Sequence, residues 1–166
     1  MDIEEMKKNA AFLIENVKGL DIPGSASFGI RYKKLIDFAK LYGITDPKYV
    51  GPEEDGIVAC HGFANFFTIK AVYQLLIGFT VVQDGKPRGI MLDPGYLLHT
   101  ANVYNWEGCV DVKPGDKLTA TGKCVDAWLN EKNMMLFYQF LVNVVNQNEE
   151  SVCNVTITAG VRKGGY

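Results

Sequence analysis

Apolar residues recur at helical spacing in three segments of the chain. The first runs from Ile3 to Val17, and the second runs from Tyr32 to Tyr42 and ends at Gly43. The third, from Ala64 to Gly78, is almost continuously apolar and opens directly after a His-Gly pair. This pattern predicts two amphipathic helices followed by one long helix that is buried on most of its surface.

The second half of the chain changes to the alternation that is typical of β-strands. Apolar residues from Cys153 to Val161 alternate with polar ones up to Arg162, and the segment from Lys117 to Cys124 alternates in the same way. The segment from Met134 to Val145 is apolar on both faces, so we expect it at the centre of a sheet.

Two further strands are expected, one around Ala26 to Ile30 and one that contains Tyr104 and Trp106. The remaining connections carry the residues of turns and loops. They are the loop from Thr45 to Gly56 and the turns at Asp84–Pro87, Lys113–Asp116 and Asn146–Glu149. Because short turns separate the four strands after the long helix, we expect these strands to form an antiparallel meander.

Helices and strands are therefore segregated along the chain, which is the pattern of an α+β fold. We expect a long central helix wrapped by a curved antiparallel sheet. With 166 residues and no repeat or low-complexity stretch, the chain is interpreted as a single domain over residues 1–166, with an extra N-terminal helix at about residues 3–18.

Composition excludes several classes of function. A net charge of −2 without a basic cluster argues against binding to nucleic acid. The N-terminal residues are acidic and the long helix is interrupted by polar residues, so neither export nor a membrane span is expected, and the chain should be cytoplasmic. The four cysteines are widely spaced, which favours buried free thiols and no metal site.

Several short motifs in this order resemble the MaoC-like hot-dog family, and more narrowly its FAS1-like, N-terminal dehydratase branch. The resemblance extends from about Phe28 to Arg162, so the opening helix lies outside it. The motifs that carry it are Phe38-Ala39, Gly43, Asp46-Pro47-Lys48-Tyr49, His61-Gly62, Leu98-His99 and Lys113-Pro114-Gly115-Asp116.

The resemblance implies a hot-dog fold that binds acyl groups as thioesters of coenzyme A or of acyl carrier protein, without another cofactor. Active relatives are hydro-lyases that add or remove water at a 2-enoyl bond in fatty acid metabolism. In them an N–H at the start of the long helix polarises the thioester carbonyl, and Gly62 matches that position. A glycine there would also simply ease the start of the helix. Gly62, Phe63 and Tyr49 are the candidate substrate-binding residues.

The catalytic pair of the family is not matched in this sequence. Active relatives carry an aspartate after the Phe-Ala helix and a histidine five positions later, and Ile44 and Tyr49 stand at those places. Isoleucine accepts no proton, and a tyrosine with a pKa of about 10 is a poor base near neutrality. Asp46 is a candidate for a displaced base, although an Asp before Pro is more often a turn residue.

Few other general bases are present, because the chain has two histidines. His61 adjoins the proposed carbonyl site and is a candidate proton donor or pantetheine contact, but a structural role at the helix start is favoured. His99 is expected to be a hydrogen-bonded core or interface residue. The acidic run from Glu53 to Asp55 is interpreted as a solvated loop.

Coenzyme A would also need a few basic groups for its phosphates. Arg162 and Lys163 after the last strand are the candidates, with Lys86 and Arg88 after the long helix as further possibilities. The aromatic strand residues are expected in the core and at a subunit interface instead of an acyl pocket. They are Tyr104, Trp106, Trp128, Phe137 and Tyr138.

The sequence thus leads to three hypotheses. The preferred one is an acyl-CoA-binding subunit that lacks the usual Asp/His pair and is non-catalytic or depends on a second hot-dog chain, as a homodimer or heterodimer. The second is an active homodimeric (R)-specific enoyl-CoA hydratase/dehydratase or a hot-dog thioesterase with a relocated base, for which Asp46, His61 or one of the loop carboxylates Glu53–Asp55 would serve. The third is an acyl-CoA carrier or scaffold.

Overall fold

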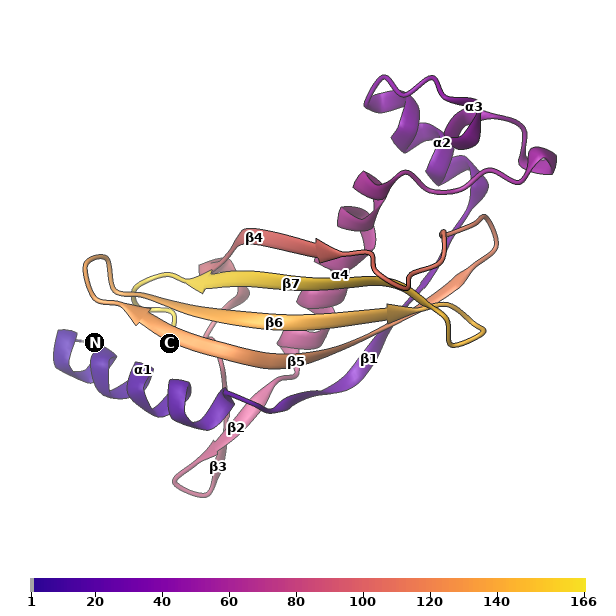
Figure 1. Cartoon of the computed structure of the whole chain (residues 1–166). Helices are drawn as coiled ribbons and strands as arrows, with labels where there is room; N and C mark the ends of the chain where they lie inside the picture. The colour runs from indigo at the N-terminus through magenta and orange to yellow at the C-terminus, as the bar shows by residue number, and fades with distance from the viewer. Residues whose placement is uncertain (1) are drawn as a thin grey trace.

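A computed structural model describes residues 2–166, and its centre is one helix lying against one sheet. Helix α4 (Ala64–Ile77) packs on strands β1 (Asp21–Gly29) and β5 (Lys117–Asn130), and the sheet curves around it (Figure 1). Seven of its side chains are buried, and their spacing places them on one broad face of the helix that points to the sheet. The long buried helix predicted from the sequence is confirmed.

The sheet has five strands in the order β1-β5-β6-β7-β4. Strand β6 (Met135–Val145) is the middle strand, between β5 and β7 (Ser151–Val161), so the central position predicted for this segment is confirmed. All neighbouring pairs are antiparallel. The two edges of the sheet are β1 and β4 (Leu97–Asn105).

The predicted meander is wrong for β4. Strands β5, β6 and β7 follow one another, but β4 pairs with β7 at the far edge, with Leu97 opposite Val161 and Asn105 opposite Asn154. The turn before β5 belongs to the other edge, because Gly115 N donates to Ile30 O at the end of β1. Turn residues indicate where the chain reverses but not which strand it then pairs with.

Strand β1 is longer than the predicted segment. It begins at Asp21 and passes through Pro23 and Gly24, two residue types that are uncommon inside strands. A shift of register between Ile22 and Ala26, with Gly24 at a φ of +84°, accommodates both residues as an irregularity in an edge strand. At Asp84–Gly85, where only a turn was predicted, the chain forms the hairpin of β2 (Thr80–Gln83) and β3 (Lys86–Gly89).

The two predicted amphipathic helices form as α1 (Ile3–Val17) and α2 (Tyr32–Leu41). Asp2 caps α1, because its Oδ1 accepts from Glu5 N at 2.8 Å. The loop predicted between α2 and α4 contains a short helix, α3 (Pro47–Val50), and a 3-10 turn at Glu53–Asp55. Residues 32–56, here called the α2–α3 arm, project from one end of the sheet (Figure 1). None of the helices within residues 2–166 is long and apolar enough to cross a membrane.

One buried hydrogen bond ties the centre of the sheet to the segment after the hairpin. Tyr138 of β6 is fully buried and donates its hydroxyl to Ile90 O at 2.8 Å. Removing this hydroxyl leaves a buried carbonyl without a donor, so we expect Tyr138→Phe to lower the free energy of unfolding by about 1–3 kcal/mol. Urea denaturation measures this. Tyr42→Phe is the matched control, since Tyr42 is exposed, and equal losses in both variants would contradict the assignment.

Candidate functional site

A cavity of about 240 Å³ lies at the start of α4. Its walls come from three parts of the chain that are distant in sequence. They are the segment that leads into the helix and its first turns, the connection between β4 and β5, and the beginning of β7. The lining residues are Ala59, Cys60, His61, Ala64, Phe67, Trp106, Cys109, Val110, Asp111, Val112 and Val152.

The floor of this cavity is apolar and its mouth is polar. Phe67 and Val152 are each 1% exposed and belong to the core, whereas His61 and Asp111 are exposed. Backbone and ionic contacts hold the two sides together, since Ala59 N donates to Val112 O at 2.8 Å and Lys48 Nζ lies 3.5 Å from Asp111 Oδ2. The ion pair also connects the α2–α3 arm to the mouth.

A stack of three aromatic rings fixes the imidazole of His61 at the mouth. The rings of His61 and Trp106 are 4.4 Å apart at an interplanar angle of 10°, and Trp106 stacks in turn on Tyr104 at 5.4 Å and 13°. Tyr104 and Trp106 were predicted to be core or interface residues. Both are half-buried and pack against the core, and Trp106 also lines the cavity, because the connection after β4 places it at the start of α4.

The other aromatic residues in that prediction lie away from the cavity. Tyr138 is fully buried in the core, as expected. Trp128 and Phe137 stack on each other with ring centroids 5.2 Å apart, and Trp128 is 38% exposed.

A polar network lies on the Tyr104 side of the stack. The Tyr104 hydroxyl donates to Asn65 Oδ1 at 2.7 Å and lies 3.1 Å from the hydroxyl of buried Thr68, so it joins β4 to the first turns of α4. Burial raises the pKa of Tyr104 above its ordinary value. The phenol is therefore neutral near pH 7 and acts as a hydrogen-bonding group instead of a base.

His99 lies at the outer end of this network. Its Nε2 is 2.7 Å from Asn102 Oδ1, and Asn102 Nδ2 donates to the Tyr104 hydroxyl at 3.0 Å. His99 is hydrogen-bonded, as predicted. Of the two predicted positions, the core is wrong, because the side chain of His99 is exposed in this chain. It is exposed because β4 is an edge strand, which the predicted meander did not reveal.

Gly62 is in the 3-10 turn (His61–Phe63) that immediately precedes α4. Within residues 2–166 its N–H has no hydrogen-bond partner, and the positive end of the helix dipole lies at the same place. A side chain added at Gly62 would meet the Phe38 ring at 3.7 Å, which is ordinary contact. The packing therefore does not demand a glycine, and the free N–H is its notable property.

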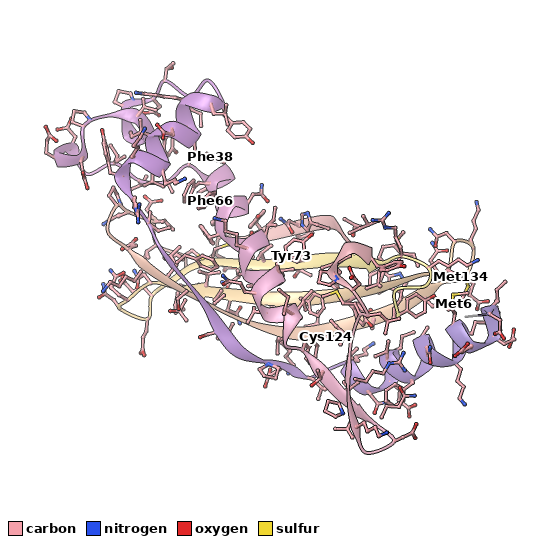
Figure 2. All side chains as sticks on the ribbon, turned by 180° about the vertical axis from the view of Figure 1, so that it is seen from behind. Met6, Phe38, Phe66, Tyr73, Cys124 and Met134 are labelled. Atoms are coloured by element: carbon pink, nitrogen blue, oxygen red, sulfur yellow. The ribbon has the colours of Figure 1, made fainter. Side chains whose placement is uncertain are left out.

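The structure does not bring the other sequence candidates into the cavity. Asp46 caps α3, since its Oδ1 accepts from Lys48 N at 2.9 Å, which is the structural role of an Asp before Pro. Tyr49 is half-buried in α3 with Lys48 Nζ 5.6 Å from its ring centre. Phe63 is buried in an aromatic cluster with Phe38 and Phe66. Figure 2 labels Phe38 and Phe66 where the arm meets α4.

Ile44 is half-buried after α2, and its N–H donates to Ala39 O at 3.0 Å. The acidic run Glu53–Asp55 is exposed, as expected.

The basic candidates lie far from the cavity within one chain. Arg162 donates to Gly95 O at 2.9 Å beyond the end of β7, whereas Val152 of the cavity is at the beginning of that strand. Ten residues of strand separate them, or about 33 Å. Lys86 and Arg88 are in the hairpin after the other end of α4, about 21 Å along the helix. Arg88 contacts Asn9 and the Phe12 ring of α1 there.

Among the polar and thiol-bearing residues of the cavity, Asp111, Cys60 and Cys109 were not identified from the sequence as site residues. Cys109 and Asp111 have no local motif, because only the crossing of the chain from β4 to β5 brings them beside Cys60 and His61. The prediction of buried thiols is right for Cys124 and Cys153 and wrong for Cys60 and Cys109, which are half-buried, while all four are free as expected. In the part of the chain described, no three His, Cys, Asp or Glu residues converge into a metal site.

No protein-family model matches the chain, and no curated protein matches it. Solved structures do match. The truncated HadBC complex, a 3R-hydroxyacyl-ACP dehydratase from Mycobacterium tuberculosis, has a TM-score of 0.63 at 16% identity, covering 87% of this chain and 97% of that one. A MaoC-like dehydratase from Rhodospirillum rubrum has a TM-score of 0.60 at 16% identity, with coverage of 90% and 94%.

A third similar structure is a hypothetical thioesterase with coenzyme A from Streptococcus pneumoniae. Its TM-score is 0.50 at 17% identity, with 96% of each chain covered. At these identities the likeness establishes the fold. The chain has the hot-dog fold of MaoC-like dehydratases, as predicted from the sequence.

The thiols provide a test of the site geometry. Burial raises the pKa of Cys124 and of Cys153 from 9.0 to about 12, which lowers their thiolate fraction about a thousandfold. At pH 8 we expect an aromatic disulfide reagent to modify Cys60 and Cys109 in the folded protein, and Cys124 and Cys153 only after unfolding. The measurement is the absorbance of the released thiol.

The double variant Cys60→Ser/Cys109→Ser is the control and should lose the rapid reaction. Rapid modification of all four thiols in the folded protein, or rapid reaction that persists in the double variant, would contradict this placement of the cysteines.

Proposed function

We propose that this chain is an acyl-thioester-binding protein of the MaoC-like enoyl-CoA hydratase/dehydratase family that acts as a non-catalytic or partner-dependent subunit. One observation carries the proposal: a small cavity with an apolar floor is lined by His61 and Ala64, which flank Gly62 and its free backbone N–H, while Ile44 and Tyr49 stand where the resemblance to the family places the catalytic pair. The names of the similar structures, two dehydratases and a protein with coenzyme A, support the ligand class.

The geometry suits a thioester group. Its carbonyl oxygen accepts hydrogen bonds and becomes more negative when a neighbouring double bond is hydrated, so a free N–H at the positive end of a helix dipole stabilises it. Gly62 supplies that N–H. The acyl chain then extends over Ala64 toward the buried floor formed by Phe67 and Val152.

Catalysis of hydration needs a base and an acid in addition to that donor. Ile44 offers neither, and Asp46, the nearest carboxylate in sequence, is occupied as the cap of α3. We infer that the isolated chain binds the thioester without turning it over. The missing pair would come from a second hot-dog chain, and the HadBC complex is by name an assembly of two components.

Strand β4 is the edge at which a second subunit would pair. The opposite edge, β1, is interrupted by Pro23 and Gly24 and by a shift of register, which are features that block pairing. An antiparallel pairing of two β4 strands about a two-fold axis reverses one sheet relative to the other. If the partner is a second copy of this chain, its Arg162 and Lys163 end would then lie beside the cavity end of the first copy, where these cations would serve the phosphates of coenzyme A.

A second candidate function rests on two residues of the cavity. His61 and Asp111 both line its mouth, so an imidazole and a carboxylate are available for an (R)-specific hydratase or a thioesterase with a relocated base. This second function requires the isolated chain to turn the thioester over, whereas the preferred function does not.

The two functions differ in a direct assay. We expect the purified chain at high concentration to leave the enoyl absorbance of trans-2-butenoyl-CoA unchanged, because no acid–base pair stands at the family positions. The same ligand should raise the melting temperature, because it binds only the folded protein.

Turnover that is lost in His61→Ala and in Asp111→Asn, but kept in the control Asp21→Asn on the far edge of the sheet, would support the relocated base and contradict the preferred function. A melting temperature that no acyl-CoA changes would contradict thioester binding altogether.

A further inference from the structure

We infer that the cavity selects short, uncharged acyl groups of a few carbon atoms, and that Ala59, Phe67 and Val152 set the length limit. This inference rests on the proposed function, because it specifies the ligand of the same site.

Volume is the first argument. A cavity of about 240 Å³ corresponds to about eight water molecules at roughly 30 Å³ each. Pockets for drug-sized ligands span about 300–1,000 Å³, so this one accommodates only a small group. A long acyl chain would have to leave the cavity or enlarge it.

The floor resists enlargement. Phe67 is part of an aromatic cluster, with its ring 6.2 Å from that of Phe63, and Val152 lies in β7 between Ser151 and Cys153, which both pair with β6. Both side chains are 1% exposed, and Val112 beside them is 6% exposed. Core side chains at native packing density have little room to move, so added methylene groups meet a fixed wall.

The distribution of charge selects against an anionic acyl end. Among the residues that line the cavity the floor carries no cation, and the nearby Lys48 is paired with Asp111 at the mouth. A terminal carboxylate would be buried without a partner or would face Asp111, and both are unfavourable. An uncharged aliphatic end is instead favoured by the apolar floor.

Calorimetric titration of the full chain with a series of thioesters tests the inference. The series is coenzyme A, acetyl-CoA, butyryl-CoA, octanoyl-CoA and malonyl-CoA. Affinity should rise about four-fold per buried methylene from acetyl to butyryl. It should then fall at least ten-fold for octanoyl-CoA, and malonyl-CoA should bind no better than coenzyme A.

Affinity that continues to rise to octanoyl-CoA, or malonyl-CoA binding as tightly as butyryl-CoA, would overturn the length and charge limits while leaving thioester binding intact. If no member of the series binds, the proposed function fails and this inference fails with it. The two failures are thus distinguishable.

Two variants change the cavity in opposite directions. Ala59→Leu fills it from the side, and we expect at least a ten-fold loss of butyryl-CoA affinity with little change for coenzyme A. Val152→Ala deepens the floor and should recover affinity for octanoyl-CoA. Ala11→Leu is the matched control, because Ala11 is exposed on α1. Equal affinities for butyryl-CoA in Ala59→Leu and Ala11→Leu would show that this cavity is not the acyl site.

Discussion

The packing of α4 against the curved sheet is the interaction on which the rest of the structure depends. The helix is apolar on most of its surface, so it is stable in water only when the sheet covers it, and Phe67, Ala71 and Leu75 are all buried there. The first turn cannot be covered in the same way, because its N–H groups need acceptors. The fold therefore leaves the polar N–H groups at the start of α4 beside the apolar floor of the cavity.

The wall around this place is rigid for a reason that is independent of any ligand. The rings of His61, Trp106 and Tyr104 stack on one another, and the Tyr104 hydroxyl is bonded to the side chain of Asn65 on the helix. These contacts connect the edge strand β4 to the start of α4. The connection that follows β4 carries Asp111, which is paired with Lys48 of the α2–α3 arm. The arm, the helix and the edge strand therefore meet at one cavity.

The local structure could be predicted from the sequence, and the long-range structure could not. The helices at Ile3 and Tyr32 follow from the period of their apolar residues, and the central strand β6 follows from a segment that is apolar on both faces; both are local properties. The position of β4 depends on which edge accepts it, and no residue in its turns encodes that choice. For this reason Trp106 and Asp111 were not predicted as cavity residues, although His61 and Gly62 were identified at the start of the helix. Asp46 caps α3, which agrees with the turn role that the sequence favoured for an Asp before Pro.

A crystal structure with a non-hydrolysable butyryl-CoA analogue tests the central claim, that an acyl thioester binds at the start of α4, most directly. The account predicts that the carbonyl oxygen accepts a hydrogen bond from Gly62 N–H at about 2.9 Å and that the acyl chain lies between Ala64 and Val152. An analogue bound elsewhere on the chain, with this cavity unchanged and Gly62 N–H free, would contradict it.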